Sequence, residues 1–306
     1  MKIVFMGSST FAIPSLRTLK QAQYDVKAVY SQPPRKAGRG KRYKEVPLAE
    51  FAFSQGLKVE QPQTFNDSDV LAVLKSYKPD FLIVVAYGLL LPREVLEIPK
   101  EFSINVHGSF LPFWRGAAPI NHVIFNRDLY TGVSIIKMSE ELDAGPILRQ
   151  EKIMLDNTET FGSLHRVLSE LGAKNLLKTL HNINANEEIL QNERFVSYAP
   201  KIKKLDAKLD FNSQASALEA RIRGLAPTPG AWFEYKKERF KVFSAEVVEG
   251  NGKAGSIINE NLTIACGKKA LSILEIQRQG KDVMSVSDLL RGFKFEKGDN
   301  VNQSTH

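Results

Sequence analysis

Phe81-Leu82-Ile83-Val84-Val85-Ala86-Tyr87-Gly88-Leu89-Leu90-Leu91 is the longest apolar run in the chain, and it decides the fold class. A membrane-spanning helix needs about 20 apolar residues, so eleven residues that include a glycine are too few. The β-branched residues at the start of the run favour a strand that is buried on both faces. Gly88 marks the exit loop of this strand.

Outward from this run, short apolar segments alternate with amphipathic ones. We expect a Rossmann-like α/β domain with a mostly parallel sheet covered on both faces. In such sheets ligands bind beyond the carboxyl ends of the strands, so functional residues are sought there. The expected strands are 3–6, 26–30, 57–60, 81–86, 102–107, 133–138 and 147–153, and the expected helices are 11–20, 47–54, 68–76, 117–125 and 160–181.

The pattern changes after the long helix. Residues 191–207 are polar and basic, which is typical of a linker, so the first domain is expected to span 1–190. Residues 208–306 hold one expected helix and several short, evenly spaced strands, which favours a small OB-like β-barrel. The polar stretch after Glu296 is expected to lack structure. The expected helix is 213–223, and the strands are 232–235, 240–248, 255–258, 262–265 and 270–277.

The charge is unevenly distributed. The chain has 42 Lys and Arg against 34 Asp and Glu, a net charge of +8. The loop 31–45 carries Arg35, Lys36, Arg39, Lys41, Arg42 and Lys44, while its only acid is Glu45. Because Lys and Arg neutralise phosphates, this loop and the basic segment 201–306 predict a polyanionic partner. The alternative is a solvated charged loop with no partner.

The few cysteine and histidine residues exclude several kinds of site. A single cysteine, Cys266, rules out an intrachain disulfide and a multi-cysteine metal centre. The histidines lack metal-ligand spacing, so no metal is expected. The chain enters structure directly from Met1, so we expect a cytoplasmic protein with no leader and no membrane segment.

Three polar residues follow strands in positions that suit catalysis. Alternation along the strand 102–107 places Asn105 and His107 on one face and turns Val106 into the core. An amide and an imidazole side by side can stabilise an oxyanion and handle a proton. Asp143, in a loop after another strand, could orient the ring of His107. A hydrogen-bonded edge of the core explains Asn105 and His107 equally well.

A longer stretch carries a specific resemblance. Asn105-Val106-His107-Gly108-Ser109-Phe110-Leu111-Pro112, followed by Phe113-Trp114-Arg115-Gly116, resembles the signature of enzymes that use 10-formyltetrahydrofolate. Phe110 stands where that pattern has leucine, and Phe113 stands where it has a basic residue. By this resemblance, Asn105, His107 and Asp143 are the catalytic residues.

Further segments resemble the methionyl-tRNA formyltransferase family in particular. They are 3–16, the basic loop 32–42, the linker sequence 198–202, and 280–284. The resemblance implies formyl transfer from 10-formyltetrahydrofolate to the α-amine of methionyl initiator tRNA, by a monomer without a metal. It places the folate against Tyr87, Gly88, Leu89, Leu90, Ser109, Phe110, Leu111 and Pro112. It places the tRNA against Arg35, Lys36, Arg39, Lys41 and Arg42, and against the carboxy-terminal domain.

Two other classes of function stay open on the sequence. A formyltransferase for a small amine, or a formyltetrahydrofolate hydrolase, would share Asn105 and His107 but leave the basic loop without a purpose. A non-catalytic RNA-binding protein would explain the charge but not Asn105, His107 and Asp143. Offering formylfolate with free methionine or with charged initiator tRNA separates these functions. Arg39→Ala is expected to weaken use of the tRNA and to leave folate binding intact.

Overall fold

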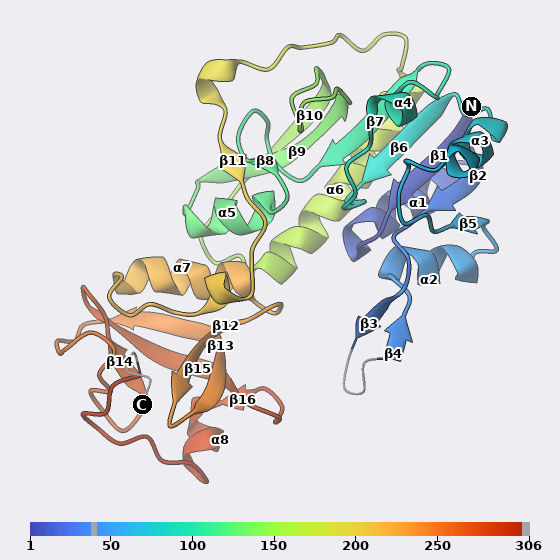
Figure 1. Ribbon diagram of the computed structural model, residues 1–306. Helices are drawn as coiled ribbons and strands as arrows, with labels where there is room; N and C mark the ends of the chain where they lie inside the picture. The colour runs from blue at the N-terminus through green and yellow to red at the C-terminus, as the bar shows by residue number, and fades with distance from the viewer. Residues whose placement is uncertain (38–41, 302–306) are drawn as a thin grey trace. The chain divides into compact units, whose positions relative to one another are not determined.

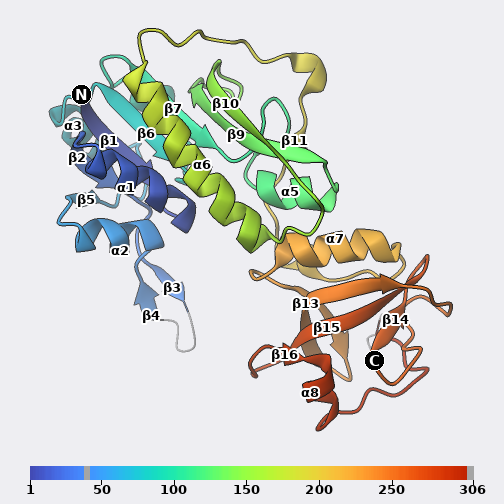
Figure 2. The same cartoon turned by 180° about the vertical axis from the view of Figure 1, so that it is seen from behind.

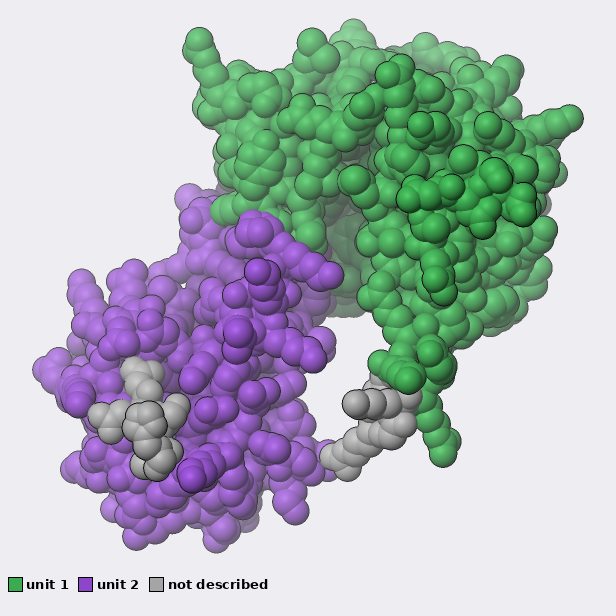
Figure 3. Space-filling model, in the orientation of Figure 1, with its two compact units in different colours: residues 1–119, 130–153, 165–199 green, residues 120–129, 154–164, 200–306 purple. Residues whose placement is uncertain are grey.

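The computed structural model describes residues 1–37 and 42–301 of the chain. The chain divides into two compact units, which are coloured separately in Figure 3. Unit 1 comprises Met1–Pro119, Tyr130–Ile153 and His165–Ala199, and unit 2 comprises Ile120–Leu129, Met154–Leu164 and Pro200–His306.

Unit 1 is built on a seven-stranded sheet in the order β10-β9-β7-β6-β1-β2-β5. Five neighbouring strands of the sheet, β7, β6, β1, β2 and β5, are parallel to one another, and β9 runs antiparallel to β7. The expected α/β class with a mostly parallel sheet is therefore confirmed. The strands are β1 (Lys2–Gly7), β2 (Asp25–Tyr30), β5 (Val59–Glu60), β6 (Phe81–Val85), β7 (Phe102–His107), β9 (Tyr130–Lys137) and β10 (Ile147–Met154).

Helices cover both faces of this sheet (Figures 1 and 2). On one face, Leu82 and Val84 of β6 pack with Leu74 and Val95 from two helices. On the other face α6 approaches closely, since a Cβ on its Gly172 would lie 2.7 Å from Val106. Burial from both sides explains the continuous apolar run of β6. The helices of unit 1 are α1 (Ile13–Gln21), α2 (Pro47–Ser54), α3 (Ser68–Ser76), α4 (Arg93–Leu96) and α6 (Phe161–His181), with a 3₁₀ turn at Thr10–Ala12, whereas α5 (Pro119–Phe125) belongs to unit 2 from its second residue on.

Two short strand pairs complete unit 1. The basic segment, expected as a loop, forms a hairpin of β3 (Arg35–Ala37) and β4 (Arg42–Lys44), which projects from the unit in Figure 1. The second pair is β8 (Arg115–Gly116) with β11 (Tyr198–Ala199), in parallel. No helix in the described residues is long and apolar enough to cross a membrane.

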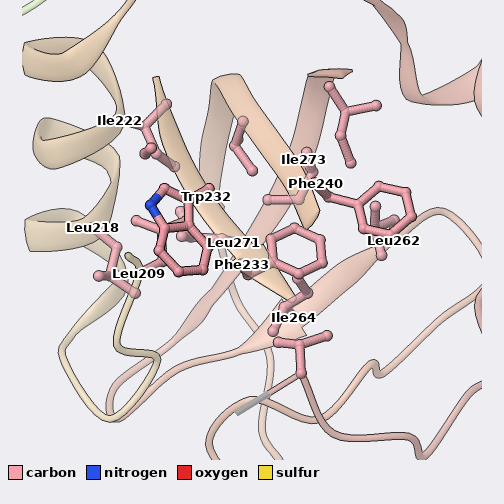
Figure 4. Packing of buried hydrophobic residues seen from close by; sticks show 14 of the residues in the cluster. Leu209, Leu218, Ile222, Trp232, Phe233, Phe240, Leu262, Ile264, Leu271 and Ile273 are labelled. Atoms are coloured by element: carbon pink, nitrogen blue, oxygen red, sulfur yellow. The ribbon is translucent and has the colours of Figure 1, made fainter. Parts of the chain in front are cut away.

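Unit 2 contains an antiparallel sheet in the order β12-β13-β15-β14, with β16 paired to β15. The expectation of a small β domain after the α/β domain is confirmed. Its core joins aromatic residues of the sheet, such as Phe233 and Phe240, to Leu218 and Ile222 of α7 (Figure 4). The elements are α7 (Ala215–Leu225), β12 (Ala231–Tyr235), β13 (Glu238–Val248), β14 (Thr263–Ala265), β15 (Ala270–Arg278), β16 (Met284–Ser285) and α8 (Val286–Leu290).

Two expectations for unit 2 are wrong. Within 255–258, Ser256 and Ile257 form isolated bridges rather than a strand, and Gly255 before them turns the chain with a positive φ of 83°. The stretch after Glu296 is structured as far as Val301, which is buried and donates its N–H to the Gly255 carbonyl at 2.8 Å. Burial of that one apolar residue anchors the polar segment before it.

Cys266 supports a prediction about reactivity. Its side chain is buried, and burial raises the pKa of the thiol to about 11. At pH 8 about 0.1% of such a thiol is thiolate, against about a quarter of an ordinary cysteine. We therefore expect a disulfide reagent to label the native protein at least ~100-fold more slowly than the protein in denaturant. Equal rates in the two states would show that the thiol is accessible.

Candidate active site

The structure brings Asn105, His107 and Asp143 together in unit 1. Asn105 and His107 lie at the carboxyl end of β7 and are both buried. Asn105 Nδ2 donates to Asp143 Oδ1 at 3.1 Å, and His107 Nδ1 lies 3.6 Å from Asp143 Oδ2. The Asp143 carboxylate therefore lies against both side chains of the strand.

Asp143 reaches this position through the loop between β9 and β10. The carboxyl end of β9 pairs Lys137 with Ile104, so the loop must turn back to meet Asn105. The turn is tight, because a Cβ on Gly145 would lie 1.8 Å from the Lys137 carbonyl oxygen. Asp143 itself has a positive φ of 51°, a conformation that a residue other than glycine adopts at a cost.

The contacts of the imidazole define where its protons lie. His107 Nε2 is 3.0 Å from the carbonyl oxygen of Trp114, and a carbonyl only accepts, so Nε2 carries a hydrogen. The contact of Nδ1 with Asp143 Oδ2, at 3.6 Å, is an ion pair only when both ring nitrogens carry a hydrogen. Asp143 Oδ2 also accepts a backbone hydrogen bond, from Gly116 N–H at 2.9 Å. Each carboxylate oxygen thus has a hydrogen-bond donor.

The loop that follows β7 holds the first predicted folate segment, Ser109 to Pro112. Ser109 and Leu111 are buried, while Phe110 and Pro112 are partly exposed. Several backbone groups already have partners: Ser134 Oγ donates to the Ser109 carbonyl at 2.8 Å and accepts from Leu111 N–H at 3.0 Å. The Leu111 carbonyl accepts from Gln150 at 2.8 Å. This loop is therefore a rigid wall next to His107.

The second predicted folate segment, Tyr87 to Leu90, follows β6, the strand next to β7. The Tyr87 ring is buried in the core, whereas the Leu90 side chain is 82% exposed. The Tyr87 carbonyl accepts from Ser8 Oγ at 2.9 Å and from Gln32 Nε2 at 3.0 Å. Gly88 fits closely against Gln32, because an added Cβ would lie 2.6 Å from Nε2.

The basic hairpin holds three of the five predicted tRNA contacts. Arg35, Lys36 and Arg42 are exposed on β3 and β4, while the predicted contacts Arg39 and Lys41 lie outside the described residues. Arg35 is directly opposite Lys44, and like charges in that position are unfavourable. An anion between the two strands would relieve this repulsion.

Sequence reasoning missed the residues that hold the site in place. Trp114 and Gly116 lie within the quoted motif, whose spacing could have pointed to them. Gln191 lies in the predicted linker, and its amide donates to the carbonyl of Asp143 at 2.7 Å. No feature of its neighbourhood in the sequence marks it, because it acts on backbone groups.

His122 and His165 do not join the site. His165 packs edge-on against Phe11, and burial lowers the pKa of its ring. His122 of α5 is 3.2 Å from the Pro200 carbonyl and packs against Phe125. Within residues 1–37 and 42–301, no cluster of three or more histidine, cysteine or acidic side chains could hold a metal ion.

Comparison with known proteins gives the same family over both parts of the chain. Residues 1–180 match the formyl transferase family, and residues 201–294 match the formyl transferase C-terminal domain. A methionyl-tRNA formyltransferase of Paramagnetospirillum magneticum is 41% identical, with 97% of this chain and 99% of that protein covered. One from Ruegeria pomeroyi is 40% identical, with 97% and 99% covered.

Solved structures share the fold at low identity. A methionyl-tRNA formyltransferase from Clostridium thermocellum has a TM-score of 0.58 and 17% identity, covering 93% of this chain and 98% of that one. A sugar 3N-formyl transferase, WlaRD, solved with dTDP and 5-N-formyl-THF, has a TM-score of 0.65 and 18% identity, covering 92% and 99%. HypX from Aquifex aeolicus with tetrahydrofolic acid has a TM-score of 0.66 and 18% identity, covering 98% and 50%.

Proposed function

The chain belongs to the methionyl-tRNA formyltransferase family and is a formyltransferase, and from this we propose that Asn105, His107 and Asp143 carry the formyl transfer. The observation that supports this assignment is the convergence of the three side chains. Asp143 Oδ1 is 3.1 Å from Asn105 Nδ2, and Oδ2 is 3.6 Å from His107 Nδ1. We propose 10-formyltetrahydrofolate as the formyl donor and the α-amine of methionyl initiator tRNA as the acceptor.

The reaction makes a negative charge that the site would stabilise. The neutral amine attacks the formyl carbon, and the carbonyl oxygen becomes an oxyanion in the tetrahedral intermediate. Asn105 has two amide hydrogens, so donation to Asp143 leaves one for this oxygen. Donors placed for a developing oxyanion each typically contribute about 10²–10³ in rate.

His107 would be the second donor. In the structure its Nε2 contacts the neutral carbonyl of Trp114 at 3.0 Å. An oxyanion is a stronger acceptor than a carbonyl, so Nε2–H would turn from Trp114 to the intermediate. The carboxylate of Asp143, 3.6 Å from Nδ1, would hold the ring in place during this exchange. The attacking nitrogen carries one hydrogen too many in the intermediate and gives it up as a proton. When the intermediate collapses, the bond from the formyl carbon to the folate nitrogen breaks and that nitrogen takes up a proton, so the net number of protons is unchanged.

The folate would lie against the two loops that follow β6 and β7. The loops start from neighbouring parallel strands, where open α/β sheets bind ligands. Ser134 and Gln150 hold the backbone of the loop after β7 by hydrogen bonds that need no ligand. The Tyr87–Leu90 and Ser109–Pro112 segments are the proposed contacts.

We propose that the tRNA contacts the basic hairpin and the second unit. A triple substitution of Lys36, Arg42 and Lys44 to alanine is expected to raise KM for the tRNA and to leave KM for the folate unchanged. Each lost phosphate contact should also reduce the slope of log affinity against log salt by about 0.7–0.9. A matched control replaces Lys75, Lys78 and Lys100, which are exposed elsewhere on unit 1. Equal effects of both triple variants would show that the hairpin contributes only its positive charge and does not contact the tRNA specifically.

The decisive assay offers formylfolate with one of two acceptors. Formylation of charged initiator tRNA without formylation of free methionine is the expected result. Turnover of formylfolate with neither acceptor would instead indicate a hydrolase. The proposed organisation of the enzyme is a catalytic domain over 1–190, a linker over 191–207 and a tRNA-binding domain over 208–306, in a cytoplasmic monomer.

A further inference from the structure

Residues 189–199, called the strap below, cross two loops of the site within unit 1. One loop carries Asp143, which faces Nδ1 of His107. The other carries Trp114, whose carbonyl faces Nε2 of the same ring. The strap is thus attached to both segments that supply partners to the imidazole.

The first attachment is to the Asp143 loop. Gln191 Nε2 donates to the carbonyl oxygens of Asp143 at 2.7 Å and Gly145 at 2.8 Å. Two residues earlier, Ile189 and Ile147 exchange backbone hydrogen bonds of 2.9 Å and 2.8 Å. The amide of Gln191 therefore spans the turn in which Asp143 adopts its positive φ of 51°.

The second attachment is to the segment after β7. Trp114 N–H donates to Ser197 Oγ at 2.9 Å, and Arg115 N–H donates to the Ser197 carbonyl at 2.8 Å. Beyond it, Gly116 pairs with Ala199 in the β8–β11 ladder. These bonds fix the Trp114 carbonyl and also the Gly116 N–H, which donates to the Asp143 carboxylate.

Arg115 connects the two attachments. Its guanidinium is completely buried, and Nε donates to Gln191 Oε1 at 3.0 Å. The terminal nitrogens reach Glu193, the closer contact being 2.7 Å. Both ends of the Gln191 side-chain amide are therefore used: the oxygen accepts from Arg115, and the nitrogen donates to the loop of Asp143.

We infer that Gln191 is a positioning residue for the formyl transfer, which acts by holding the backbone of Asp143 so that the carboxylate faces His107. The inference rests on the proposed function for the catalytic role of Asp143. A left-handed backbone at an aspartate is not its preferred conformation, so the carbonyl needs a partner to keep it. Misplacing a catalytic group by about 1 Å can cost about 100-fold in rate.

Two variants separate the contacts of Gln191. Gln191→Glu keeps an acceptor for Arg115 but replaces the donor to the two carbonyls with an oxygen. Gln191→Met has similar length and removes both contacts. We expect both variants to lower kcat by about 10- to 100-fold, with KM for folate and tRNA changed less than about twofold. A loss in Gln191→Met alone would assign the effect to Arg115 and overturn the inference, as would normal kcat in both.

A control and a second readout distinguish positioning from damage to the fold. Asn186→Asp removes a similar amide-to-carbonyl bond, of 2.9 Å to Thr179, in unit 1 but outside the site, and is expected to keep full activity. The ¹⁵N signals of the His107 ring report its contacts directly, without turnover. They are expected to shift in Gln191→Glu and not in Asn186→Asp, with unchanged melting temperatures. Unshifted ring signals in Gln191→Glu would overturn the inference.

The same series separates this inference from the proposed function. If Asp143→Asn leaves kcat unchanged, the catalytic assignment fails whatever Gln191 does. If Asp143→Asn lowers kcat, the double variant with Gln191→Glu is expected to be no slower than Asp143→Asn alone, because residues that act through one group are not additive. Additive losses would show that Gln191 acts independently of Asp143.

Discussion

Replacing His107 with alanine is expected to lower kcat for formyl transfer by a factor of about 10²–10³ and to leave KM for both substrates nearly unchanged. The ring is buried between two fixed partners, with the Trp114 carbonyl at 3.0 Å from Nε2 and Asp143 at 3.6 Å from Nδ1. The ring is therefore held in place before substrate binds, and its Nε2–H would turn from Trp114 to the oxyanion only as negative charge develops. Its loss should thus remove stabilisation of the transition state rather than ground-state binding.

The measurement is steady-state formylation of charged initiator tRNA, with both substrates varied. His181→Ala is the matched control, because this histidine is exposed at the end of α6. The control is expected to keep kcat within about twofold. A rise in KM for the folate with normal kcat would reassign His107 to binding.

The parallel part of the sheet and its ligand edge could be predicted from the sequence. The apolar run of β6 has one physical explanation, burial on both faces, and alternation fixes which side chains of β7 share a face. That Asn105 and His107 share a face therefore followed from the strand alone, whereas their catalytic role was implied only by the resemblance of the motif. The structure confirms the fold class, with α3 and α4 on one face and α6 on the other.

The approach of Asp143 could not be predicted in the same way. The rule that places functional residues after carboxyl ends assumes parallel strands, and β9 is antiparallel to β7. Its carboxyl end lies beside Ile104, and the loop reaches Asn105 only by turning back. That turn depends on the close fit of Gly145 against Lys137 and on the positive φ of Asp143. Neither feature leaves a periodic signal in the sequence.

The strap was hidden for a related reason. Gln191 and Ser197 lie in a polar stretch that has the composition of a linker, and their partners are backbone groups of Asp143, Trp114 and Arg115. A contact to a backbone group places no requirement on the residue type of its partner. Only the three-dimensional path of the chain shows that this stretch belongs to the site.

Asn105→Asp is expected to reduce kcat by about 10³ or more, a larger loss than that of Asn105→Ala. Alanine removes one oxyanion donor, which typically costs about 10²–10³. Aspartate removes the same donor and also places a carboxylate where Nδ2 now lies 3.1 Å from Asp143 Oδ1. Two carboxylates at that separation repel each other, so the Asp143 side chain should turn away from the strand and from His107.

Comparing the loss of kcat in the two Asn105 variants therefore tests the hydrogen bonds that Asn105 donates, and not only the presence of a polar group at this position. If Asn105 only fills space at the edge of the core, the isosteric aspartate should be the milder change and the alanine cavity the more damaging one. If Asn105 donates to both Asp143 and the oxyanion, the isosteric aspartate lowers kcat more than alanine does, because it places a negative charge against a negatively charged oxygen at both contacts. Single-turnover formylation with saturating folate and tRNA measures the chemical step for each variant. Thermal unfolding of the same samples separates a cavity from a catalytic loss, since only Asn105→Ala leaves an unfilled volume beside Asp143.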